Sequence, residues 1–299
     1  MRIEFKYSLI SDLVFHVLAH MQVNNASNLY SREYIESFPV SIEPGLRDKV
    51  SRIENYYNAN FARLCMINFL PIYCSDLESL RRLLLSYDRF SGEDVQSFIK
   101  PFVAILEDEF QNYKNFWESK IQQLPVDQGR CEKYFADRLN DCKEIFDYFG
   151  KDAEASFSLS LTRNGRGTFS ADKFFGIVPY PSKEEELPNR FFQLFHEYTH
   201  QFTDKLLNTT IDMADGSHDI SENLVILADY FIFQKISEET AAAYLRWIAK
   251  GSGKENDKMD EAEFINIFHV PAELIRLLDD EIAKIYAPNQ NQFHKSSRP

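Results

Sequence analysis

The stretch 191–208, FFQLFHEYTHQFTDKLLN, combines a helical pattern of apolar residues with two histidines and a glutamate. Its apolar residues recur with the period of a helix that buries one face: Phe191, Phe195, Tyr198, Phe202 and Leu206. Polar residues sit among them. We therefore expect a buried helix that carries His196, Glu197 and His200 within its apolar surroundings.

The two histidines are four residues apart, so a helix places them side by side, where two imidazoles can bind one metal ion. Glu197 directly follows His196, a position that suits a base acting on water rather than a third ligand. Unpaired polar groups in a buried helix would cost about 1–3 kcal/mol each. The H-E-x-x-H pattern at 196–200 therefore predicts a metal site with its own catalytic base.

A second histidine pair provides an internal comparison. HVLAH, residues 16–20, has the same spacing, but Val17 stands where the base would be. We interpret His16 and His20 as ordinary core or surface histidines.

A catalytic zinc normally has three protein ligands and one open position. Glu222 follows His200 by 22 residues, at the start of a strongly apolar helix expected over 219–236, and is the predicted third ligand. An alternative is a capping box, in which Asp219 caps this helix and Glu222 reaches back to its backbone. His218 and Asp215 are reserve ligands.

Two motifs carry a resemblance to a known family. HEYTH at 196–200 followed by ISENL at 220–224 resembles the gluzincin metallopeptidases, the thermolysin-like and neprilysin-like group. That family has an aspartate four residues after the ligand glutamate, where this sequence has Ile226. Asp229, seven residues after Glu222, is a candidate replacement. The metzincin extension is excluded, because Thr203 and Leu206 stand where that subclass has glycine and histidine.

The resemblance implies a zincin-like catalytic core that binds Zn²⁺ through His196, His200 and Glu222 and hydrolyses a peptide or protein substrate. Zinc in such a site lowers the pKa of water and polarises the scissile carbonyl, while Glu197 acts as general base. A further group would stabilise the oxyanion, and the candidates are His218, Tyr230, Tyr180 and His269. The alternative is a catalytically inactive zincin-fold protein with a metal-binding or regulatory role.

The overall pattern predicts a mainly α fold with a small β-sheet, of the α+β class. Helical periodicity dominates from Ser8 to about Gly150, and Pro101 falls inside a helical pattern, where it should kink or restart the helix. The predicted domains are a helical N-terminal region at 1–150, a zincin-like core at 151–288 and a disordered tail at 289–299.

The predicted sheet lies within 155–180. ASFSLSL alternates serine with larger apolar residues, typical of a strand with one face in solvent. Asn164–Gly165 indicates a hairpin turn, and KFFGIVPY, 173–180, is the expected returning strand. By resemblance to zincins, SFSLSL or KFFGIVPY would be an edge strand that binds an extended peptide.

Charge and hydropathy restrict the class of partner. The chain of 299 residues has 46 acidic against 33 basic side chains, a net charge of −13, so phosphate backbones and anionic membrane surfaces would be repelled. No apolar run approaches the roughly 20 residues that span a bilayer, and the N-terminal stretch lacks a secretory-signal pattern. We expect a cytoplasmic protein that binds neither nucleic acid nor membrane. No pattern indicates an oligomeric state.

Overall fold

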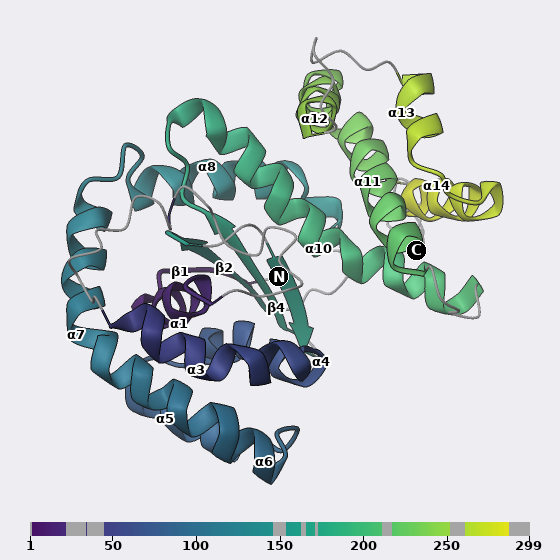
Figure 1. The fold of residues 1–299 in the computed structure, drawn as a ribbon. Coiled ribbons are helices and arrows are strands. Elements are labelled where there is room, and N and C mark those ends of the chain that lie inside the picture. Colours follow the sequence, from purple (N-terminus) through teal and green to yellow (C-terminus); the bar gives the residue numbers. More distant parts are fainter. Residues whose placement is uncertain are drawn as a thin grey trace, which may run out of the picture. The chain divides into compact units, whose positions relative to one another are not determined.

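The computed structural model is mainly helical with one four-stranded sheet, which confirms the predicted fold class (Figure 1). The structure describes residues 2–21, 34, 45–145, 154–162, 166–170, 173–210, 217–251 and 261–286. The tail expected to be disordered, 289–299, lies outside these residues.

The chain divides into two compact units, each built from separated segments. Unit 1 comprises 1–2, 133–153 and 191–299, and unit 2 comprises 3–132 and 154–190. This division differs from the boundary expected at residue 150. The strands between 154 and 179 belong to the same unit as the helices before residue 132, so the sheet does not open a separate C-terminal domain.

Unit 2 contains a bundle of helices beside the sheet. Its α-helices are α1 (Leu9–Ala19), α3 (Leu46–Ala59), α4 (Phe61–Leu64), α5 (Leu77–Ser86), α6 (Gly92–Asp94) and α7 (Lys100–Gln122), and α8 (Gln128–Asp141) begins there. Single turns are η1 (Cys65–Asn68), η2 (Leu70–Tyr73), η3 (Val95–Ile99) and η4 (Glu184–Glu186). Helix α7 contacts α1, α3 and α5, so these four helices share one core.

Two local features of unit 2 follow from sequence. Helix α1 is buried from Ile10 to Ala19, as expected for a helix that is apolar nearly all round. Pro101 lies in the first turn of α7, directly after the π-helical turn η3. Because proline lacks an amide hydrogen, the regular helix restarts there. The predicted restart at Pro101 is confirmed.

The sheet has the order β1-β2-β4-β3, with strands β1 (Arg2–Lys6), β2 (Glu154–Ser160), β3 (Arg166–Ser170) and β4 (Lys173–Pro179). Strand β4 runs parallel to β2 and antiparallel to β3. The predicted hairpin of SFSLSL with KFFGIVPY is therefore wrong, because β3 forms the antiparallel pair with β4. Asn164–Gly165 lies outside the described residues. The predicted edge role is also wrong for both strands, since β1 and β3 are outermost.

The serine face of β2 is not in solvent, contrary to the prediction. Ser156 and Ser160 are buried, as are Phe157 and Leu159 on the opposite face. Side chains on both faces of β2 are therefore covered, as is usual for strands of a parallel pair. The Ser160 hydroxyl meets the side chain of Asp12 on α1, which shows that α1 covers this face.

Unit 1 is helical in its described part. Most of α10 (Leu187–Thr210) lies in it, followed by α11 (Ser217–Ile236), α12 (Glu238–Gly251), α13 (Glu261–Ile267) and α14 (Ala272–Tyr286). Helix α11 contacts α12 and α14, and it is hydrophobic on nearly all sides, as a central helix must be. Phe192 of α10, Phe233 of α11 and Tyr244 of α12 pack together through their rings.

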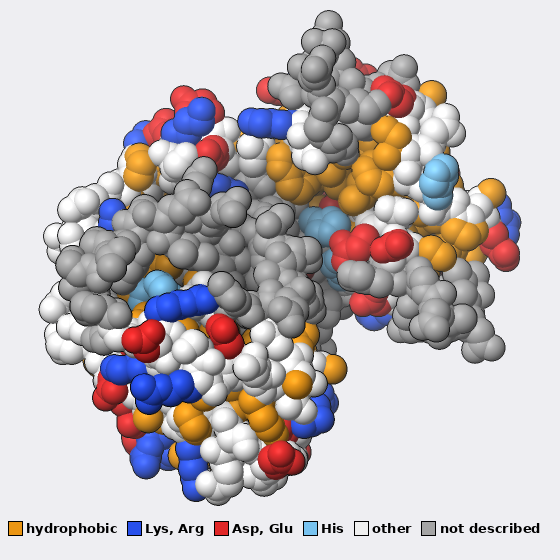
Figure 2. Space-filling view, viewed as in Figure 1, with side chains coloured by type: hydrophobic (Ala, Val, Ile, Leu, Met, Phe, Trp, Pro, Cys, Tyr) orange, Lys and Arg blue, Asp and Glu red, His pale blue; other side chains and the backbone are white. Residues whose placement is uncertain are grey.

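Side chains of both charges lie on the surface of unit 2. Figure 2 shows basic and acidic side chains interspersed where α3 and α5 lie in Figure 1. Among the described helices, none is both long enough and apolar enough to cross a membrane.

Asp12 is a buried carboxylate that links three elements of unit 2. It is 1% exposed and accepts hydrogen bonds from Ser160 of β2, from the Trp117 indole of α7 and from the Leu161 amide. Burial raises its pKa to about 6, although the three hydrogen bonds oppose this shift. The folded protein therefore binds a proton here more tightly than the unfolded chain does.

Substitution of Asp12 by Asn should change how stability depends on pH. Because the folded pKa is raised, the Asp12 contribution is most favourable below about pH 4 and is lost as the pH rises through 6. An asparagine avoids this loss and can still accept from Trp117 and donate to Ser160. The stability of Asp12→Asn relative to wild type should thus rise between pH 4 and 7, by at most about 3 kcal/mol.

Urea unfolding at pH 4, 5, 6 and 7 measures this difference. Asp88→Asn, at an exposed position, is the control and should run parallel to wild type. A constant difference between Asp12→Asn and wild type across this range would contradict the assignment.

Candidate metal centre

Helix α10 presents the two motif histidines on one side. His196 and His200 are one turn apart, with ring centroids 5.1 Å from each other. The helix is anchored by Phe195, whose ring lies 4.8 Å from that of Phe233 on α11. Apolar packing between α10 and α11 therefore determines which residues of α11 lie opposite the two histidines.

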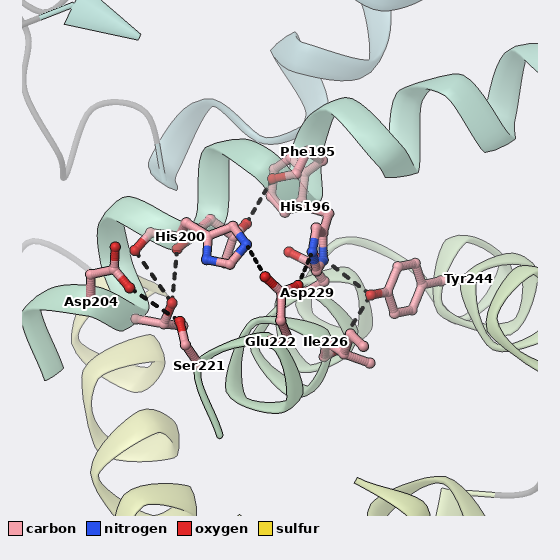
Figure 3. Close-up of polar contacts among 11 residues, drawn as sticks. Phe195, His196, His200, Asp204, Ser221, Glu222, Ile226, Asp229 and Tyr244 are labelled. Carbon is pink, nitrogen blue, oxygen red and sulfur yellow. Dashed lines mark hydrogen bonds and ion pairs between the residues drawn. The ribbon is translucent and has the colours of Figure 1, made fainter. Parts of the chain in front are cut away.

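Glu222 of α11 meets both histidines. Its Oε2 lies 3.2 Å from Nε2 of His196, and its Oε1 lies 3.5 Å from Nε2 of His200 (Figure 3). One ligand atom from each of the three residues lies within 4.8 Å of the others. The structure thus brings together the three residues that the sequence predicted as metal ligands.

A buried carboxylate lies behind His196. Asp229, two turns after Glu222 on α11, is 0% exposed and places Oδ2 3.4 Å from Nδ1 of His196. Tyr244 of α12 donates to the same oxygen at 3.2 Å. With its Nδ1 hydrogen directed to Asp229, His196 turns Nε2 toward Glu222, to which this nitrogen donates a hydrogen bond when the ring is protonated and with which it would share a metal ion when it is not. A hydrogen held on Nδ1 by Asp229 leaves Nε2 as the nitrogen that can bind a metal.

The electrostatics of the cluster favour a positive charge. Burial alone would lower the pKa of His196, but hydrogen bonds to Asp229 and Glu222, with the charges of Asp229 and Glu197, raise it to about 10. The field that stabilises a proton on this imidazole would also attract a divalent cation placed among the same carboxylates.

The donor set fits zinc. Bonds of about 2.0–2.2 Å at tetrahedral angles separate neighbouring ligand atoms by about 3.4 Å. The histidine–glutamate distances, 3.2 Å to Oε2 and 3.5 Å to Oε1, are of this size but reach the two different oxygens of Glu222, and one ligand atom from each of the three residues lies within 4.8 Å of the others. Two imidazoles and a carboxylate also suit other first-row divalent metals, so the geometry favours a class of cations that includes zinc.

The cluster is accessible. The side chains of His196 and His200 are each 16% exposed, and that of Glu222 is 38% exposed. Figure 2 shows histidine and acidic side chains at the surface beside hydrophobic ones where α10 and α11 lie in Figure 1. Glu197, the predicted base, is partly exposed. A small molecule could therefore reach the three ligands.

The alternative role for Glu222 as part of a capping box does not hold. Helix α11 begins at Ser217, so Asp219 is inside its first turn rather than at the capping position. Asp215 lies outside the described residues, and His218 belongs to α11 but its side chain is not described.

The other predicted residues are less closely connected to the cluster. Tyr230 accepts from Gln234 at 2.9 Å and packs its ring on Phe264 of α13. His269 is exposed between α13 and α14. Tyr180 belongs to unit 2, where its hydroxyl accepts a hydrogen bond from Gln128 at 3.0 Å. Among the described contacts, none joins Tyr230 or His269 to the metal-ligand residues, so the oxyanion partner stays a prediction.

The comparison pair, His16 and His20, has different surroundings. His16 is 0% exposed, bonds through Nδ1 to the Tyr34 hydroxyl at 2.8 Å and stacks on Tyr113. Burial lowers its pKa. Within the described ranges, the pair joins no group of three metal-ligating side chains, in agreement with the interpretation of His16 as a core histidine.

Two residues of the site were not predicted. Tyr244, which donates to Asp229, resembles any other core aromatic of its helix in sequence. Ser221 donates to Asp204 of α10 at 3.3 Å, a second link between the two helices. Neither residue has a spacing or motif that would have indicated its role.

Comparison of the chain with protein-family models, curated protein sequences and solved structures found no match. The resemblance to gluzincins therefore rests on the two short motifs and on the side chains that they place together.

Substitution of Asp229 by Asn should weaken metal binding. The amide is nearly isosteric but carries no charge, so His196 loses the partner that fixes its tautomer and increases its basicity. Loss of such a partner typically weakens metal affinity by about 10- to 100-fold. Zinc affinity measured by competition with a chromogenic chelator tests this.

Tyr230→Phe is the matched control, since it removes a hydroxyl from the next residue of α11 without touching the cluster, and it should bind zinc as wild type does. Equal affinity of Asp229→Asn and wild type, with an unchanged circular dichroism spectrum, would show that Asp229 does not support the ligand.

Proposed function

We propose that this protein is a zinc-dependent metallopeptidase, with His196, His200 and Glu222 as the metal ligands. The observation that supports the proposal most strongly is the convergence of these three side chains, from two helices, to within 4.8 Å. Two of them flank a glutamate at the position of a catalytic base. A site that only stored metal would gain nothing from that glutamate.

The protein's own residues have separate roles in this proposal. Zinc would supply Lewis acidity, which polarises the scissile carbonyl and acidifies water. Glu197 accepts the proton of the attacking water and returns it to the leaving amine. Asp229 holds His196 in its ligand tautomer, and Tyr244 holds Asp229.

An inactive metal-binding or regulatory protein is the alternative. The aspartate that the gluzincin pattern has four residues after the ligand glutamate is Ile226 here. Asp229, one turn after Ile226 on α11, contacts His196. A carboxylate therefore still supports this histidine. This contact favours the enzyme over the inactive protein.

Glu197→Gln should abolish peptide hydrolysis and leave zinc binding intact. Loss of a general base reduces the rate by about 10²- to 10⁴-fold, whereas the amide leaves all three ligands in place. The measurements are cleavage of a fluorogenic peptide library and zinc content by plasma mass spectrometry.

Glu239→Gln, at an exposed position of α12, is the control and should cleave as wild type does. Zinc bound by wild type with no cleavage of any peptide would establish the inactive alternative. Cleavage unaffected by chelators or by Glu197→Gln would refute the catalytic role of the site.

A further inference from the structure

Unit 2 contains a cavity of about 510 Å³ beside the start of helix α1. This volume is within the range of about 300–1,000 Å³ that small-molecule sites occupy. The cavity has aromatic walls, serine hydroxyls and one lysine, and all of its lining residues belong to unit 2. It is therefore independent of the metal cluster in unit 1.

The first turn of α1 borders the cavity. Ser8, which caps the helix, and the three residues that follow all line it. The first amides of a helix have no intrahelical acceptors, and the helix dipole makes this end positive. Helix α1 has 11 residues, enough for this end to attract an anion.

Ser11 provides an independent indication of a ligand. It lines the cavity and is 3% exposed, and its hydroxyl has no hydrogen-bond partner in the described part of the chain. Buried hydroxyls are nearly always hydrogen-bonded, and an exception requires an explanation. Ser156 and Ser158, which share one face of β2, line the same cavity. Three serines thus border the cavity.

The charges around the cavity suit one negative charge. Lys6 lines it, 39% exposed, with Nζ 3.3 Å from Glu4 and 5.8 Å from the ring centroid of Phe175. Asp76 also lines it but is exposed and caps helix α5 through the Ser79 amide. The oxygens of buried Asp12 are engaged by Ser160, Trp117 and Leu161. One lysine and one helix terminus would not balance a dianion beside these carboxylates.

The remaining walls suit an aromatic ring. Tyr73 is 49% exposed, unusual for so large an apolar side chain, and its ring meets that of Phe175 edge-on at 4.8 Å. Phe110 and Trp117 of α7 line the cavity as well. Aromatic pairs are most stable in stacked or edge-to-face arrangements, which these four rings offer to a planar ligand.

We propose that this cavity binds an aromatic monoanion, a planar ring with a carboxylate or sulfonate. The acidic group lies at the first turn of α1, where it accepts from the Ser11 hydroxyl and faces Lys6. The ring lies among Tyr73, Phe110, Trp117 and Phe175.

Two fluorescent probes that differ in one charge test the proposal. 8-Anilinonaphthalene-1-sulfonate carries the sulfonate, and N-phenyl-1-naphthylamine lacks it. The sulfonate probe should bind the full-length protein saturably, one per chain, and more tightly than the neutral probe. Lys6→Gln and Ser11→Ala should each weaken the sulfonate probe by about tenfold and change the neutral probe by less than twofold.

Lys49→Gln and Ser86→Ala, at positions outside the cavity, are the matched controls and should leave both affinities unchanged. Phenylacetate should displace the sulfonate probe at lower concentrations than neutral 2-phenylethanol does. The proposal is overturned by unsaturable binding, by sulfonate affinity that neither cavity variant changes, or by equal displacement by the two competitors. Ser11→Ala removes an unpartnered hydroxyl, so loss of the fold is not expected to obscure the result.

Discussion

The candidate metal centre depends on one buried carboxylate. Asp229 of α11 is fully buried where α10 and α12 contact this helix. A buried carboxylate is stable only when hydrogen-bonding or oppositely charged groups contact it. His196 and Tyr244 supply them to Oδ2, while no hydrogen bond to Oδ1 occurs within the described residues. This pairing orients the ring of His196 and links α10 to α11 at the level where Glu222 lies opposite both histidines.

The convergence of His196, His200 and Glu222 was predictable because each residue occupies a position with geometric meaning. His196 and His200 are one helical turn apart, and Glu222 starts the next apolar helix. Asp229 was a candidate from its place on the face of Glu222. Tyr244 was not, because its sequence neighbourhood is that of a core aromatic and only the packing of α12 on α11 directs its hydroxyl to Asp229. Tertiary contacts of this kind leave no local signal.

The fold class could be predicted from periodicity, but the pairing of strands could not. The alternation in 154–160 correctly indicated a strand, whereas β3 and the parallel pairing of β2 with β4 depend on contacts between separated residues. Strand β1 alternates Ile3 and Phe5 with charged residues over only five positions, too short a pattern to stand out. Serines 156 and 160 resemble a solvent face but are buried, and Asp12 provides Ser160 with a polar partner inside the core.

In the proposed metal centre, two imidazoles and one carboxylate bind a single cation. X-ray absorption at the zinc edge of the zinc-loaded protein measures this directly. We predict two imidazole ligands at about 2.0–2.1 Å and oxygen ligands at about 2.0–2.2 Å, with one imidazole lost in His200→Ala and an oxygen contribution altered in Glu222→Gln. A spectrum without imidazole scattering, or one that neither substitution changes, would contradict the metal centre.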